Sequence, residues 1–192
     1  MPVHADIETL LHRASEGDRE AWSRLVELVY PDLKRLARSA IGGRQRHTLD
    51  TTALVHECYL RLSRAAGTPR DTGHLMALAA RIMRQLLIDH ARERLADKRG
   101  GGAGTVSLDG VDAAGEEAFE NLVEIDRALS QLASESPRQA QVFECRYFGG
   151  LNDEQTASAL GISPRTAHRD WDAGRAWLAA ALGGSQEAAQ PA

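Results

Sequence analysis

The spacing of the apolar residues constrains the fold of this chain more than any other feature of its sequence. Apolar side chains recur at intervals of three and four residues along most of its length, and no stretch shows a sustained two-residue alternation or an Asn-Gly hairpin turn. Intervals of three and four place side chains on one face of an α-helix, whereas a half-buried strand needs an interval of two. The sequence therefore predicts an all-α protein.

Five helices are expected in the first half of the chain, because glycine, proline and capping residues interrupt the apolar pattern there. The residues that mark helix ends are, in chain order, Gly17, the cap Asp18, Pro31, Gly42-Gly43, and Asp50 or Thr51. Pro31 is expected to begin a separate third helix, since proline suits the first turn of a helix. The fourth helix covers TTALVHECYLRL, and the fifth runs from about His74 to Lys98.

A change of composition after the fifth helix predicts two small helical domains joined by a Gly-rich flexible linker. Residues 99–117, RGGGAGTVSLDGVDAAGEE, are rich in glycine and contain few large apolar residues. A phosphate-binding glycine loop would need a following Lys-Ser/Thr, or a strand before it and a helix after it, and neither is present. We expect one domain over 1–98, a second over 118–182, and a disordered tail over 183–192.

The most specific local pattern is NDEQTASALGISPRTAHRDW, which begins at Asn152. Asn152 can cap a short helix, with the side chain of Gln155 reaching back as in a capping box. Gly161 can adopt the left-handed conformation that ends this helix, and Ser163-Pro164 can cap and begin the next one. A short helix, a tight glycine turn and a capped second helix predict a helix-turn-helix.

The second helix of this pattern divides into an apolar face and a polar face. The residues expected to pack inward are Ala167, Trp171, Gly174 and Leu178. The candidate DNA-contacting residues near its start are Arg165, Thr166, His168 and Arg169, with Asp172 on the same side. In a major groove the arginines can reach guanine edges or phosphates. The alternative is an ordinary helical hairpin with a solvated polar face.

The fifth predicted helix, HLMALAARIMRQLLIDHARERLADKR, carries many hydrogen-bond donors. They are Arg81, Arg84, Gln85, Arg92, Arg94, Lys98 and Arg99. Basic residues along one helix can follow a phosphate backbone, and Gln85 can contact a base. The alternative is a solvated face on a helical bundle.

The net charge and the residue spacing argue against a nucleic-acid-coating protein, a metal or cofactor protein and a membrane protein. The formal net charge of −4 argues against non-specific coating of nucleic acid, although residues 31–46 hold five basic residues against one acidic one. Cys58 and Cys145 lack the paired spacing of a zinc site, so no metal or other cofactor is expected. The chain shows no signal-peptide pattern and no apolar run long enough to span a membrane, so we expect a cytoplasmic protein without membrane contact.

An enzymatic function is not expected. The candidate catalytic groups are the pairs Asp89-His90 and His56-Glu57. Neighbouring residues on a helix point about 100° apart, and neither pair has an adjacent nucleophile or metal-ligand spacing. We therefore expect no catalytic residues and no small-molecule substrate.

Three segments, in order, carry a resemblance to a known family: TTALVHECYLRL, ALAARIMRQLLIDHARER and FGGLNDEQTASALGISPRTAHRDW. Together they resemble bacterial RNA polymerase sigma-70 factors of the extracytoplasmic-function (ECF) subfamily, and in particular a branch linked to Ser/Thr protein kinases. The resemblance implies that the first domain binds the β′ clamp helices of core RNA polymerase and opens the −10 promoter element. It also implies that the second domain binds the β flap and recognises the −35 element.

The resemblance assigns residues to each role. Those matching the segment that binds the polymerase clamp are Asp50, Thr51, Thr52, Leu54, Val55, Glu57, Leu60 and Arg61. Those matching the −10 segment are Arg81, Arg84, Gln85, Arg92 and Arg94. The −35 residues are the helix-turn-helix set Arg165, Thr166, His168 and Arg169. Asp89 also falls in the −10 segment and is expected to form a salt bridge within the bundle rather than to contact DNA.

The start of the clamp-binding helix departs from the family pattern. Many relatives have an acidic run resembling Asp-Ala-Glu-Asp where this chain has Asp50, Thr51, Thr52 and Ala53. Phosphorylation of Thr51, the first choice, or of Thr52 would restore negative charge at a helix N-terminus, where anions are favoured. We therefore hypothesise a phosphorylation switch operated by a Ser/Thr kinase; the alternative is that the threonine only caps the helix.

A different function would use the same C-terminal half. The chain could be a helix-turn-helix transcriptional regulator with a helical sensory domain that does not bind core polymerase. That alternative leaves TTALVHECYLRL and the long basic helix without a role.

Overall fold

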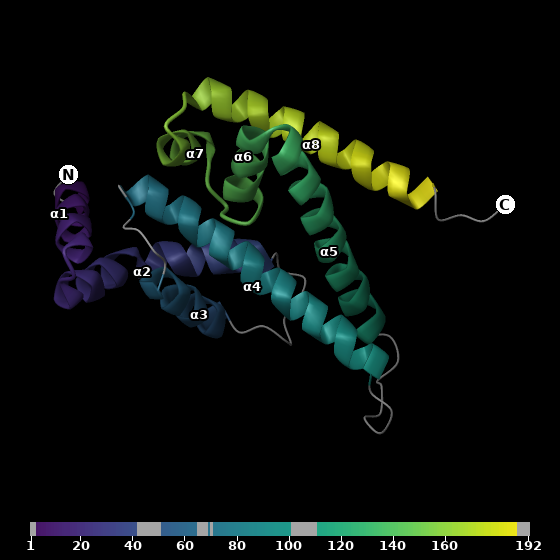
Figure 1. Ribbon diagram of the computed structural model, residues 1–192, viewed down its shortest axis with the longest axis horizontal. Coiled ribbons are helices and arrows are strands. Elements are labelled where there is room, and N and C mark those ends of the chain that lie inside the picture. Colours follow the sequence, from purple (N-terminus) through teal and green to yellow (C-terminus); the bar gives the residue numbers. More distant parts are fainter. Residues whose placement is uncertain (1–2, 42–50, 65–68, 70, 101–110, 188–192) are drawn as a thin grey trace.

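The computed structural model describes residues 3–41, 51–64, 69, 71–100 and 111–187, and every regular element within these ranges is an α-helix (Figure 1). In chain order the helices are α1 (Val3–Ser15), α2 (Arg19–Ile41), α3 (Thr51–Arg64), α4 (Thr72–Gly100), α5 (Val111–Glu135), α6 (Pro137–Tyr147), α7 (Asp153–Leu160) and α8 (Pro164–Glu187). The all-α prediction is confirmed. None of the described helices is both long enough and apolar enough to cross a membrane.

The turn between α1 and α2 forms as predicted. Gly17 has a φ of +92°, a conformation that residues with a side chain rarely adopt. A carboxylate oxygen of Asp18 accepts hydrogen bonds from the backbone N–H groups of Glu20 and Ala21, both at 3.0 Å. Asp18 therefore caps α2, and these bonds together with Arg13 hold the pKa of its carboxyl below the usual value.

The prediction that Pro31 begins a separate helix is wrong. Residues 19–41 form one continuous helix, with Pro31 inside it. Leu25, Val29, Leu33 and Ala37 recur every four residues across the proline, and all four are buried in the core. Burial of this continuous stripe outweighs the cost of a proline within a helix, which is about 3 kcal/mol.

Helix α4 lies at the centre of the molecule. It packs against α2 and α3 on one side and against α5, α6 and α7 on the other, and Figure 1 shows it running between these two groups. The buried apolar residues form one contiguous cluster that includes Leu33 of α2, Leu75 of α4, Leu129 of α5 and Phe148 beyond α6. The first and second halves of the chain therefore share a core along α4.

Two helices extend into segments that were predicted to be linker and tail. Helix α5 begins at Val111, inside the predicted linker 99–117, and residues 101–110 of that stretch lie outside the described part of the chain. Helix α8 continues to Glu187, inside the predicted tail 183–192. Alanine and glutamate favour helix, and Phe119 anchors the early part of α5 in the core. The division into two domains stays a prediction.

Candidate nucleic-acid interface

Helices α7 and α8 form the predicted helix-turn-helix. The Oδ1 atom of Asn152 accepts a hydrogen bond from the backbone N–H of Gln155 at 2.8 Å, and the Gln155 side chain accepts one from the Asn152 N–H at 3.1 Å. Gly161 ends α7 with a φ of +66°. The Oγ atom of Ser163 accepts a hydrogen bond from the Thr166 N–H at 3.1 Å and so caps α8. These local bonds set the angle between the two helices.

The first two turns of α8 present a polar surface. Arg165, His168 and Arg169 are exposed, and Thr166 is half-buried beside its cap. Together with Asp172 these residues line a shallow depression of about 450 Å³. The structure thus brings all four predicted −35 residues to one surface, with two guanidinium groups and the N-terminal end of a helix facing outward. Both features favour phosphate.

Carboxylates flank His168 within this surface. Its Nδ1 atom lies 3.1 Å from a carboxylate oxygen of Asp153, and its Nε2 atom lies 3.4 Å from one of Asp172. Arg146 of α6 also pairs with Asp153. The imidazole is therefore held between Asp153 of α7 and Asp172 of α8. No cluster of metal-ligating side chains forms within the described ranges.

An ion pair between a buried aspartate and an exposed arginine anchors α8 to α6, and sequence reasoning missed it. Asp170 is only 2% exposed, and one of its carboxylate oxygens accepts a hydrogen bond from the Nε of Arg138 at 2.5 Å. This bond raises the pKa of the Arg138 guanidinium. Trp171, predicted to pack inward, stacks on Phe143 of α6 at 5.3 Å between ring centroids, with the guanidinium of Arg146 over its ring. The apolar and ionic contacts together fix the orientation of α8.

The predicted −10 residues of α4 fall into two groups. Arg81, Gln85 and Arg94 are exposed. Arg84 and Arg92 form ion pairs with acidic residues of the second half of the chain; the Arg84 side chain is only 16% exposed, whereas that of Arg92 is 55% exposed. The structure therefore does not leave the predicted −10 set open as one continuous surface.

The predicted salt bridge of Asp89 within the bundle is confirmed. One of its carboxylate oxygens lies 3.4 Å from the Nη2 atom of Arg61 on α3. Arg61, which the resemblance assigns to polymerase binding, also lies 3.4 Å from a carboxylate oxygen of Glu57. The Arg61–Asp89 ion pair thus links the C-terminal part of α3 to the middle of α4.

Burial on α3 limits which of its assigned residues can contact a partner. Leu54 and Val55 are 3% and 2% exposed and pack with Cys58 and Leu62 in the core. Thr52 is exposed, whereas Thr51, Glu57, Leu60 and Arg61 are half-buried. Leu54 and Val55 therefore hold α3 on the bundle and are not part of its exposed surface. Asp50 lies outside the described residues.

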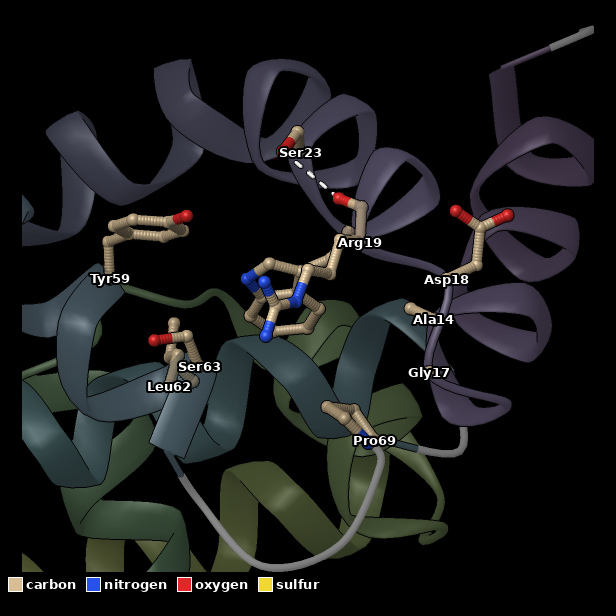
Figure 2. A pocket seen from close by; sticks show the side chains of 10 residues that line it. Ala14, Gly17, Asp18, Arg19, Ser23, Tyr59, Leu62, Ser63 and Pro69 are labelled. Atoms are coloured by element: carbon tan, nitrogen blue, oxygen red, sulfur yellow. Dashed lines mark hydrogen bonds between the residues drawn. The ribbon is translucent and has the colours of Figure 1, made fainter.

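A pocket that the sequence did not indicate opens between the α1–α2 turn and the end of α3 (Figure 2). Its volume is about 500 Å³. Figure 2 shows the Arg19 side chain extending toward its middle, between Tyr59 and Asp18. The indole Nε1 of Trp22, another lining residue, is buried and has no hydrogen-bond partner within the described part of the chain. None of the residues assigned to DNA or polymerase binding lines this pocket.

Comparison with protein families places the chain in one of them. A family model described as "ECF sigma factor" (Sigma70_ECF) matches residues 4–184, which is nearly the whole chain. A search of curated proteins found no match. The matched range includes α1 to α4 as well as the helix-turn-helix.

Proposed function

The chain belongs to the ECF sigma factor family, and on that premise we propose that it binds core RNA polymerase and directs it to promoters through contacts of α8 with the −35 element and of α4 with the −10 element. The observation that carries the proposal is the exposed basic start of α8, held by a capped turn and by buried contacts to α6. The family match over α1 to α4 also favours a sigma factor over a regulator that does not bind polymerase, because such a regulator needs only the C-terminal half.

In the proposed −35 complex the start of α8 enters the major groove. Arg165 and Arg169 then contact guanine edges or phosphates, and the N-terminal end of the helix faces a phosphate. His168 adds a contact whose position is set by Asp153 and Asp172. The ion pairs Arg138–Asp170 and Arg146–Asp153 hold α6, α7 and α8 together, so that Arg165, His168 and Arg169 keep their positions when DNA binds.

Footprinting of the −35 element by the polymerase holoenzyme tests this arrangement. Arg165→Ala is expected to weaken binding by about 1–3 kcal/mol if the side chain reads a base, and to lower the salt dependence if it contacts a phosphate. Arg127→Ala, which removes an exposed arginine of α5, is the matched control. Equal footprints for both variants would exclude a −35 role for Arg165.

An apolar groove in the C-terminal half suits the proposed contact with the β flap. It has a volume of about 500 Å³ and lies between α5, α6 and α8. Its apolar lining includes Ile125, Phe143, Tyr147, Leu178 and Leu182. A groove of this kind accepts an apolar segment of a partner, and the exposed Arg175 at its edge can pair with an acidic residue beside that segment.

The proposed contact with the β′ clamp uses the exposed side of α3. Its first turn contains no acidic residue, so it lacks the negative charge that complements a basic clamp surface. Thr51 and Thr52 stand at this N-terminal end, where a phosphate is favoured by the helix dipole and by backbone N–H groups. Thr52 is the more exposed of the two, so a kinase can reach it more readily. We therefore include a phosphorylation switch at these threonines in the proposed function.

Run-off transcription with core polymerase tests both the sigma function and the switch. Thr52→Glu is expected to increase transcript several-fold over wild type, while Ser63→Glu, which adds the same charge at the other end of α3, is expected to have no such effect. Thr51→Ala/Thr52→Ala should keep only the basal level and should not respond to kinase. If the double alanine variant works as well as kinase-treated wild type, the switch is excluded, whereas the absence of polymerase binding by every variant contradicts the sigma function itself.

A further inference from the structure

The pocket between the α1–α2 turn and the end of α3 holds an arginine that no described residue neutralises. Arg19 lines the pocket, and Figure 2 shows its side chain extending into it. The neighbouring Arg13 pairs with Asp18 at 2.6 Å. Arg24, further along α2, pairs with Glu20 at 3.3 Å. Arg19 forms no ion pair within the described ranges, so its guanidinium offers its charge and its N–H donors to the pocket.

A second hydrogen-bond donor of the pocket also lacks a partner. Trp22 lines the pocket, and it follows Arg19 by three residues on α2, which places the two side chains on one face of the helix. Its indole Nε1 atom is buried, yet it donates to no acceptor among the described residues. Nε1 of Trp177, by contrast, donates to a carboxylate oxygen of Glu135 at 3.1 Å. A buried N–H group without an acceptor is unfavourable, and an acceptor bound in the pocket can satisfy it.

Asp18 is the acidic member of the described pocket lining, and its carboxylate is already engaged. Its Oδ2 atom accepts hydrogen bonds from Nε and Nη2 of Arg13 at 2.9 and 2.6 Å. Its Oδ1 atom accepts from the backbone N–H groups of Glu20 and Ala21. Asp18 is therefore not available to neutralise Arg19, and the pocket favours an anion over a cation.

The rest of the lining suits the body of a small organic molecule. Ala14 and Leu62 contribute apolar surface. The hydroxyl of Ser23 donates to the backbone oxygen of Arg19 at 3.0 Å, which leaves the lone pairs of its oxygen free to accept. In Figure 2 the hydroxyl of Tyr59 points toward Arg19. The volume of about 500 Å³ lies within the range of about 300–1,000 Å³ that is usual for small-molecule sites.

We propose that this pocket binds a small organic anion, whose carboxylate or phosphate group accepts hydrogen bonds from Arg19 and from Nε1 of Trp22. Both kinds of anion match the donors of a guanidinium group. A hydroxyl on the body of the ligand donates to Ser23, and its apolar part lies against Leu62. The ligand thereby joins α2 to α3. The site does not depend on the proposed function, because none of the residues assigned to DNA or polymerase binding lines it.

Nuclear magnetic resonance of the isotope-labelled full-length protein tests the site, because the chain has only 3 tryptophans and each gives one indole N–H signal. The probes are adenosine monophosphate and para-hydroxybenzoate, which join a ring and a hydroxyl to a phosphate and to a carboxylate, respectively. Adenosine and para-hydroxybenzyl alcohol are their neutral counterparts. The Trp22 signal is identified by its loss in Trp22→Phe.

In the wild type, an anionic probe is expected to shift the Trp22 indole signal and to leave those of Trp171 and Trp177 in place. The indole N–H of Trp22 gains an acceptor, whereas both other tryptophans lie in α8, away from the pocket. The neutral counterparts should produce no such shift. The probe that binds more tightly identifies the anion that the site prefers, phosphate or carboxylate.

Two variants test the role of Arg19. Arg19→Gln should weaken binding of the preferred probe about tenfold or more, because it removes a charge-assisted hydrogen bond. Ser23→Glu places a carboxylate four residues after Arg19, where it can pair with the guanidinium and displace the anion. Arg24→Gln is the matched control, since it removes the same charge from an exposed position of α2 outside the pocket. All three positions are exposed, so the variants are expected to fold.

A shift of the Trp22 signal that is lost in Arg19→Gln and Ser23→Glu, but kept in Arg24→Gln, supports the site. The proposal is overturned if both anionic probes bind the wild type with dissociation constants above about 1 mM. It is equally overturned if the neutral counterparts bind as well as the anions, or if Arg19→Gln and Arg24→Gln bind alike. Run-off transcription can succeed in each of these cases, so the failure of the site is distinct from a failure of the proposed function.

Discussion

At the scale of single residues, the ion pair of Asp170 and Arg138 decides how firmly α8 is held against α6. Asp170 is almost fully buried, while Arg138 is largely exposed and supplies its main partner across the α6–α8 contact. A carboxylate left in that position without its partner loses hydrogen bonds that water cannot replace. The arginine therefore contributes to stability although it lies at the surface.

Arg138→Ala is expected to lower the free energy of unfolding by about 1–3 kcal/mol, because the buried Asp170 carboxylate then keeps only the longer hydrogen bond, 3.4 Å, from Nη2 of Arg169. Urea unfolding followed by circular dichroism gives the value. Arg127→Ala should change it by less than about 0.5 kcal/mol, as surface substitutions commonly do. Equal losses in the two variants would show that Asp170 does not depend on Arg138.

His90 makes the stability of the α4–α5 contact depend on pH. Burial lowers the pKa of its imidazole below 6.5, and the nearby Arg94 lowers it further, while Glu93 acts in the opposite direction. The folded protein thus binds fewer protons than the unfolded chain between the two pKa values. The contribution of neutral His90 is complete above pH 6.5 and is lost as pH falls below that value.

Wild type is therefore expected to lose stability between pH 7 and pH 5 more steeply than His90→Leu does, since the variant removes this titration. Thermal unfolding at a series of pH values measures the difference between the two slopes. Because both proteins share the six other histidines, only the difference between the slopes belongs to His90. A difference of zero would contradict the depressed pKa.

At the scale of elements, packing against the core overrides a local helix-start signal in α2, whereas local capping signals are enough to define α7. Pro31 carries a helix-start signal, yet buried residues before and after it keep α2 continuous. The capping box of Asn152 and Gln155 and the left-handed Gly161 act within a few residues, so the helix-turn-helix could be predicted from sequence alone. A helix end can be predicted from the sequence when nearby capping residues determine it. It cannot be predicted when burial in the core opposes the local preference.

Pro31→Ala is expected to raise the free energy of unfolding by about 1–3 kcal/mol, because it restores a backbone donor and removes a ring from the interior of α2. Chemical unfolding provides the measurement. Pro164→Ala is the contrasting variant, since Pro164 stands at the first position of α8 and costs no hydrogen bond there. A gain of the same size in both would point to a general proline effect rather than to the position in α2.

At the scale of the whole molecule, α4 belongs to the packing of both halves. Apolar residues from α2, α4, α5 and the turn after α6 form one buried cluster. Separate cores would melt separately, whereas a shared core couples the halves. We expect one transition in differential scanning calorimetry for wild type, and two for Gly73→Ala, in which the close contact of α4 with α7 is broken. Two transitions in the wild type would show that the halves are energetically independent.

The sequence by itself determined the helical class, the helix-turn-helix and the family resemblance, because these depend on short-range spacing, capping and motif order. It could not determine what covers each apolar or charged face. Leu54 and Val55 suit a partner surface equally well until the core is seen to bury them. Arg84 suits DNA until Asp126, 42 residues away along the chain, is seen to bind it. Only the tertiary structure decided those pairings, since an apolar or charged side chain does not specify its partner and only the packed chain brings distant residues together.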